Sequence, residues 1–157
     1  YECGTLTTDQ FRDRICKEVG RELPGEEIDQ IWNAMLKDIP DYKFELLLKL
    51  QENYKLYLLS NTNDLHWGHC ADKFVYKGMQ MLGCFTRVFL SYQMHLAKPD
   101  AEIFRTVLKE AGIKAEETLF VDDSKDNCQA ASLLGIKVFH YVPGDNLEIQ
   151  LQNFISK

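Results

Sequence analysis

The sequence of 157 residues lacks the features that would place it in a membrane, on nucleic acid or outside the cell. No apolar run approaches the roughly 18 residues needed to cross a bilayer, and no secretory signal is visible. Lys and Arg number 18 against 24 Asp and Glu, and no stretch is basic, which argues against a nucleic-acid partner. The 5 cysteines include no C-x-x-C pair, which is typical of free thiols in a reducing compartment. We therefore expect a cytoplasmic protein with neither a membrane nor a nucleic-acid partner.

The N-terminal part of the chain predicts a series of helices. Thr7 and Gln10 have the spacing of a capping box, and Gly20 is placed to end the helix that follows. A second apolar stripe with helical spacing runs over Ile28–Leu36, and Pro40 stops it. A third helical pattern then leads toward the first strand.

Short β-rich runs alternate with helical patterns in the rest of the chain. Strands are expected at 55–60, 87–91, 118–121 and 137–142, and helices from about 64 and over 100–111, 125–134 and 146–155. This alternation predicts an α/β fold, a three-layer Rossmann-like parallel sheet with helices on both faces. The ligand crevice of such a sheet lies outside the carboxyl ends of its strands. We therefore expect a partial helical cap over 1–40 and an α/β core over 41–157.

Polar side chains follow three of the predicted strands. Ser60 and Asn61 end the first, Lys98 follows the second, and Asp122 and Asp123 end the third. Because parallel strands present their carboxyl ends at one edge of a sheet, a hydroxyl, an ammonium group and two carboxylates are expected to converge there. That set of groups suits a phosphate and a divalent cation.

In this order and spacing the three pieces resemble the haloacid dehalogenase (HAD) superfamily of hydrolases. Ser60 matches its second motif, Lys98-Pro99 its third and Asp122-Asp123 its fourth, so the resemblance covers essentially the whole chain. The family's first motif is an Asp-x-Asp after the first strand, and no such motif precedes Ser60. We therefore expect the catalytic nucleophile and the acid/base Asp to lie outside this chain, which would be inactive alone. A missing N-terminal segment is expected to supply the central strand and complete the sheet.

The acidic pair is the expected metal site. Mg²⁺ prefers oxygen ligands and takes one or two carboxylates, leaving its other positions to water and phosphate. By resemblance to the family, Asp123 is the direct ligand, and Asp122 is expected to act through a water. Asn127, on the helix after the acidic pair, is expected to steady the site with a hydrogen bond; the alternative is a plain exposed helix residue. The alternative is that the pair only caps a helix and complements its dipole.

The expected phosphate site comprises Ser60, Asn61 and Lys98. A hydroxyl and a backbone amide at a helix approach bind phosphate oxygens, and a lysine offers a compact positive charge. The alternatives are an ordinary Ser-Asn-Thr turn and a solvated lysine. The resemblance implies a phosphatase that acts through an aspartyl-phosphate intermediate. A helical cap that excludes water favours a small phosphorylated metabolite, such as a sugar phosphate.

Other functions stay open at this point. A HAD protein can be a metal-independent 2-haloacid dehalogenase, although two clustered carboxylates would then serve no purpose. A non-catalytic HAD-like binding protein would explain the absent first motif. The segment His66-Trp67-Gly68-His69-Cys70 could suggest zinc, but no second Cys/His cluster completes four ligands. His66 and Trp67 are expected to pack near the boundary between cap and core, where His66 could touch substrate.

Overall fold

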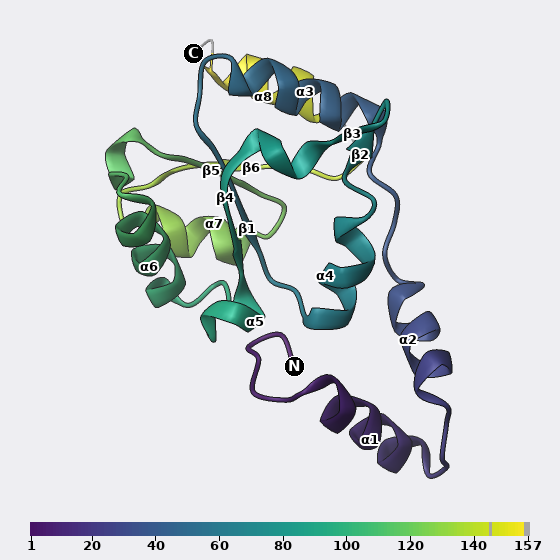
Figure 1. The fold of residues 1–157 in the computed structure, drawn as a ribbon. Helices are drawn as coiled ribbons and strands as arrows, with labels where there is room; N and C mark the ends of the chain where they lie inside the picture. Colours follow the sequence, from purple (N-terminus) through teal and green to yellow (C-terminus); the bar gives the residue numbers. More distant parts are fainter. Residues whose placement is uncertain (145, 156–157) are drawn as a thin grey trace. The chain divides into compact units, whose positions relative to one another are not determined.

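The computed structural model describes residues 1–144 and 146–155, and the chain forms two compact units, Tyr1–His95 and Leu96–Lys157 (Figure 1). Residues 145 and 156–157 of the predicted core lie outside the described residues. The elements of the first unit are α1 (Thr8–Val19), α2 (Gly25–Asn33), α3 (Asp41–Gln51), β1 (Leu56–Ser60), α4 (Asp64–Ala71), β2 (Val75–Tyr76), β3 (Met79–Gln80), η1 (Met81–Cys84), β4 (Phe85–Leu90) and α5 (Ser91–Met94). Those of the second unit are α6 (Ala101–Ala111), η2 (Ala115–Glu117), β5 (Leu119–Asp122), α7 (Lys125–Ser132), β6 (Lys137–His140) and α8 (Leu147–Ile155).

The caps of α1 confirm the local prediction. Thr7 Oγ1 accepts a hydrogen bond from the Gln10 amide at 3.2 Å, and Gln10 Oε1 accepts one from the Thr7 amide at 3.0 Å. Gly20 ends the helix with a φ of 70°, a left-handed conformation that costs glycine little. The predicted extent of the second helix was wrong, because α2 ends at Asn33. There the Leu36 amide bonds to the Asn33 carbonyl in a turn, which takes the chain out of the helix.

In the first unit, β1 and β4 run parallel and in contact along their length (Figure 1). The antiparallel hairpin of β2 and β3 was not predicted. Its turn residues, Lys77 and Gly78, both have positive φ values, 50° and 78°, which match the twist of a tight hairpin. One buried cluster surrounds Phe44, Tyr76 and Met81, so the hairpin contributes to the same core as α3.

In the second unit, β5 and β6 are parallel, and α7 packs on both strands. Ile103 and Phe104 of α6 are buried, and the rings of Phe104 and Phe120 meet edge to face with their centroids 5.2 Å apart. These buried residues mark the packing face of α6, the helix predicted over 100–111.

The predicted α/β fold with parallel strands is confirmed. Within the described residues the parallel strands form two separate pairs, β1–β4 and β5–β6. β5 has no pairing partner there besides β6, and its residue Val121 is 37% exposed. The boundary between cap and core at residue 40 and the strand that would complete the sheet both stay predictions. No helix in the described part of the chain combines the length and apolarity needed to cross a bilayer.

Candidate functional site

Asp122, the last residue of β5, lies at the centre of a polar network in the second unit. Its Oδ2 accepts a hydrogen bond from Lys98 Nζ at 2.7 Å. Its Oδ1 accepts two further bonds at 2.9 Å, one from the Ser124 amide and one from Asn127 Nδ2. The Lys98 and Asp122 side chains are only 9% and 8% exposed, so this is a buried ion pair. The structure therefore joins three of the predicted site residues, Lys98, Asp122 and Asn127.

This network determines the charge of Asp122. Burial by itself would raise the pKa of its carboxyl group, because removal from water disfavours the charged form. The hydrogen bonds from Lys98, Ser124 and Asn127 outweigh that effect, and the pKa of Asp122 lies below its ordinary value. Asp122 is therefore ionised at neutral pH, and both of its oxygens are engaged by donors of the protein.

The next residue, Asp123, is in a different environment. It is exposed, and its carboxylate has no bonding partner among the described residues. Its backbone carbonyl, in contrast, is 3.0 Å from His140 Nε2 of the neighbouring strand. Since a carbonyl can only accept, Nε2 carries the proton, and the bond holds the backbone at this strand end. The Asp123 carboxylate is left with both oxygens available to a ligand from solution.

The carboxylates at this strand end suit a hard cation that keeps most of its own water. Over residues 1–144 and 146–155, no group of three or more His, Cys, Asp or Glu side chains could hold a metal ion. Two adjacent carboxylates nevertheless match the share of ligands that a protein commonly gives to Mg²⁺. The sequence 66–70 forms no zinc site there, and all 5 cysteines are free thiols.

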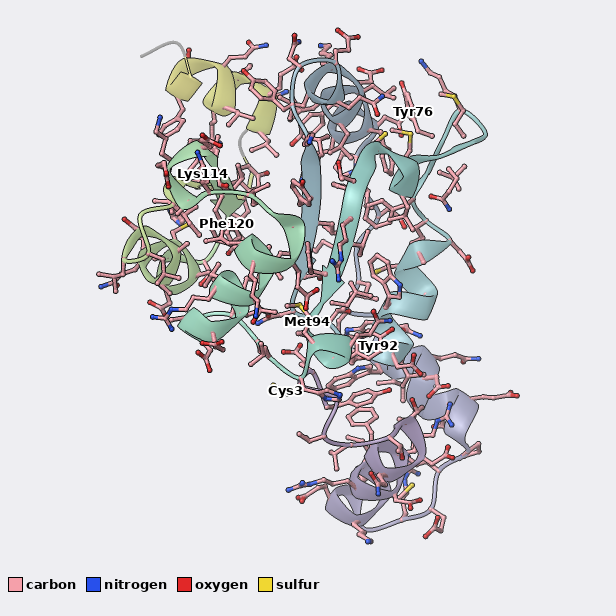
Figure 2. All side chains as sticks on the ribbon, turned by 60° about the vertical axis from the view of Figure 1, so that its left-hand side comes forward. Cys3, Tyr76, Tyr92, Met94, Lys114 and Phe120 are labelled. Carbon is pink, nitrogen blue, oxygen red and sulfur yellow. The ribbon has the colours of Figure 1, made fainter. Side chains whose placement is uncertain are left out.

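Lys98 is positioned by more than its carboxylate partner. Its Nζ lies 5.5 Å from the centroid of the Phe120 ring, which is labelled in Figure 2 and belongs to the same strand as Asp122. A cation near an aromatic face is stabilised by the electron density of the ring. The lysine thus contacts two residues of a single strand, β5.

Ser60 and Asn61 belong to the first unit, where Ser60 ends β1 and Asn61 begins the loop between β1 and α4. That loop is held by a residue that sequence reasoning missed. Ser91 is fully buried; its Oγ accepts a hydrogen bond from the Thr62 amide and donates one to the Thr62 carbonyl, both at 2.9 Å. The sequence feature that could have identified Ser91 is a hydroxyl residue directly after the apolar end of a strand. Asn63 then caps α4, since its Oδ1 accepts from the His66 amide at 3.0 Å.

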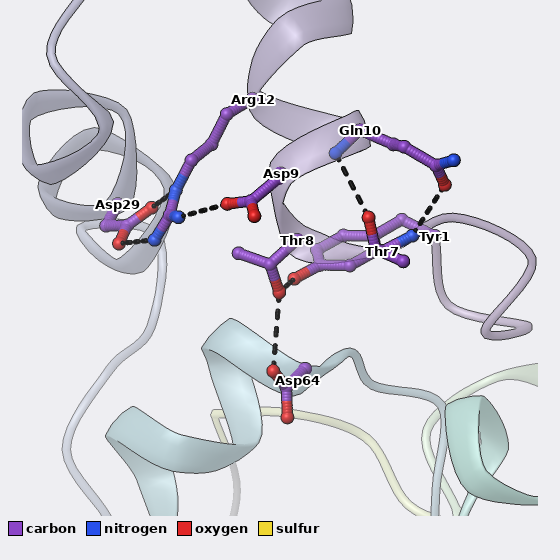
Figure 3. A network of polar contacts seen from close by, with 8 residues as sticks. All are labelled: Tyr1, Thr7, Thr8, Asp9, Gln10, Arg12, Asp29 and Asp64. Atoms are coloured by element: carbon purple, nitrogen blue, oxygen red, sulfur yellow. Dashed lines mark hydrogen bonds and ion pairs between the residues drawn. The ribbon is translucent and has the colours of Figure 1, made fainter.

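The helices α1 and α2 approach the start of α4 within the same unit. Thr8 Oγ1 donates to Asp64 Oδ2 at 3.3 Å, and the Tyr1 hydroxyl is 2.8 Å from Thr8 Oγ1 (Figure 3). The Trp32 ring of α2 is stacked on the His66 ring with centroids 5.3 Å apart. His66 thus packs where α2 meets α4.

Comparison with known proteins gives a consistent result. Residues 6–135 match the haloacid dehalogenase-like hydrolases. The chain is 36% identical over 140 residues to D-ribitol-5-phosphate phosphatase of Bacteroides thetaiotaomicron, covering 88% of this chain and 68% of that protein. It is 27% identical over 143 residues to a sesquiterpene phosphatase of Aspergillus oryzae, covering 89% and 69% of the two chains.

A solved structure shares the fold. It is a HAD-family enzyme of Bacteroides thetaiotaomicron in complex with magnesium and inorganic phosphate, with a TM-score of 0.91 and 44% identity over 94% of this chain and 75% of that one. The family match spans well over half of the sequence. The chain therefore belongs to the haloacid dehalogenase-like hydrolases.

Proposed function

We propose that this protein is a Mg²⁺-dependent phosphatase that hydrolyses a small phosphate monoester, such as a sugar phosphate, through an aspartyl-phosphate intermediate. The observation that carries the proposal is the contrast between two adjacent carboxylates. Asp122 is buried and committed to Lys98 and Asn127, whereas Asp123 is exposed and unpaired among the described residues. A relative that is a ribitol-phosphate phosphatase and a neighbour with bound magnesium and phosphate support it.

In this proposal Asp123 is the direct ligand of Mg²⁺, and Asp122 contacts the ion through a water. When bound, the ion offsets the negative charge of a phosphoryl group. Asn127 acts on Asp122, whose Oδ1 it holds at 2.9 Å, and thereby fixes the direction of that carboxylate. The family resemblance is the basis for the covalent intermediate.

The phosphoryl group is proposed to bind Ser60, Asn61 and Lys98. The loop that begins at Asn61, directly after Ser60 at the end of β1, is held at Thr62 by the buried Ser91 hydroxyl. Lys98 is held in place by Asp122 at 2.7 Å. Binding an anion therefore requires little further loss of conformational freedom from the lysine side chain. A phosphorylated metabolite of the cytoplasm is the substrate that we propose.

The test is Mg²⁺-dependent hydrolysis by the full-length protein and its Asp123→Asn variant. The substitution keeps the size of the side chain and removes its charge, so we expect turnover to fall on the order of a hundredfold or more. Asp126→Asn is the matched control, because Asp126 is an exposed carboxylate three residues further along, on α7. It should leave turnover and the Mg²⁺ requirement as in the wild type.

The same assay separates the alternatives. Wild-type activity that survives a chelator, with halide released from a 2-haloacid, would identify a metal-independent dehalogenase. If the full-length protein binds phosphate but hydrolyses no phosphate ester, the result would identify a non-catalytic binding protein. Wild-type-like turnover by Asp123→Asn would remove Asp123 from the metal site.

A further inference from the structure

His66 lies in the first turn of α4, close in sequence to the proposed phosphate-binding residues Ser60 and Asn61. His66 is the third residue of this helix, and Asn63 Oδ1 fixes its backbone amide at 3.0 Å. Side chains of an α-helix point back toward its N-terminus, so His66 covers the turn that emerges from the loop of Ser60 and Asn61. A phosphate held by that loop would therefore place the rest of its ester within reach of this side chain.

The His66 ring is held in one orientation and in one tautomer. Its Nε2 lies 3.0 Å from the backbone carbonyl oxygen of Trp32, and its plane is inclined by 20° to the Trp32 ring. Because a carbonyl only accepts, Nε2 carries the proton, and in the neutral ring Nδ1 is an acceptor. Within the described part of the chain Nδ1 has no partner, nor is it among the buried unpaired atoms. Nδ1 is therefore an oriented acceptor that is not fully buried.

A series of contacting aromatic rings holds the His66 ring in place. Tyr1 stacks on Phe11 at 4.4 Å between centroids, and Phe11 contacts Trp32 at 4.7 Å. α1 and α2, which carry Phe11 and Trp32, are joined by Arg12, whose Nη2 and Nε reach the two oxygens of Asp29 at 2.6 and 3.0 Å (Figure 3). Binding therefore requires little additional ordering of the histidine.

We propose that His66 is a specificity-determining residue whose Nδ1 accepts a hydrogen bond from a hydroxyl of the substrate, so that polyhydroxylated phosphate esters are preferred. The inference rests on the phosphatase function proposed above. A polyol hydroxyl satisfies the acceptor, whereas a hydrocarbon leaving group would remove water from it and leave it unpaired, which is unfavourable. The position thus discriminates a polyol phosphate from a terpenoid phosphate.

The experiment compares kcat/KM for a pentitol 5-phosphate and for phenyl phosphate in the full-length enzyme. Phenylalanine at this position keeps a ring against Trp32 and has no acceptor. We expect His66→Phe to lower kcat/KM for the pentitol phosphate about tenfold, the value of one hydrogen bond, and to leave phenyl phosphate within about threefold. His69→Phe, on the exposed surface one turn further along α4, should change neither value.

A second variant keeps the inference testable if the first is unstable. His66→Asn places an oxygen near the position of Nδ1 and should restore part of the preference for the pentitol phosphate. Equal losses with both substrates, or no loss with either, would overturn the role of His66 while leaving the phosphatase function intact. A wild-type enzyme that hydrolyses neither ester would instead refute the proposed function, and the inference with it.

Discussion

Replacing Lys98 by Met removes one partner of the buried ion pair that organises the candidate site. The distance from Nζ to Asp122 Oδ2 is 2.7 Å. At an effective dielectric constant of ~20, two unit charges at this separation attract by about 6 kcal/mol. Desolvation of both groups offsets much of that attraction. We therefore expect a coupling free energy of about 2–4 kcal/mol, in the range of measured close charge pairs.

The assay is a double-mutant cycle on the full-length protein, with urea unfolding of the wild type, Lys98→Met, Asp122→Asn and the double variant. Lys98→Met should lower the free energy of unfolding by about 3 kcal/mol, because an uncompensated buried carboxylate remains. The control cycle uses Lys114 and Glu117, whose side chains are 67% and 66% exposed and should couple by less than about 0.5 kcal/mol. A coupling at Lys98 and Asp122 no larger than in this control would refute the reasoning.

The pH dependence gives the same pair a second readout. The pKa of Asp122 is lowered in the folded protein, so its ionised form stabilises the fold above the unfolded value of about 3.9. That stabilisation is lost as the pH falls through the folded-state pKa. The stability difference between wild type and Asp122→Asn should therefore shrink on acidification below about pH 4. A difference that stays constant down to about pH 2 would contradict a lowered pKa.

Two further substitutions test the first unit. An ideal Cβ at Gly4 would lie 2.1 Å from the carbonyl oxygen of Tyr92, at a φ of 65°, where the turn near Cys3 meets α5 (Figure 2). Gly4→Ala should therefore lower the thermal midpoint more than Gly78→Ala, which has a positive φ but open space, and equal losses would show that the contact is not tight. Arg12→Lys should lower the free energy of unfolding in urea by about 1 kcal/mol, because an ammonium group cannot make the bidentate contact with Asp29. An unchanged urea midpoint would refute this expectation.

Local signals in the sequence determined the elements that depend on near neighbours. The capping box of Thr7 and Gln10 and the left-handed Gly20 were predictable because their partners lie within four residues. Alternating apolar runs predicted the parallel α/β fold, and the polar residues at three strand ends indicated the family. The spacing of residues along the chain indicates these features, so they can be predicted without knowing which distant residues are in contact.

Only the tertiary structure decided which polar groups meet. The contact between Lys98 and Asp122 spans 24 residues of sequence, and that between Ser91 and Thr62 spans 29. Two adjacent aspartates look alike in the sequence, yet burial and three donors separate Asp122 from its exposed neighbour Asp123. Long-range packing sets such differences, because the environment of a charge depends on what the fold brings against it. The Trp32 carbonyl that orients His66 is likewise 34 residues away and leaves no trace in the local pattern.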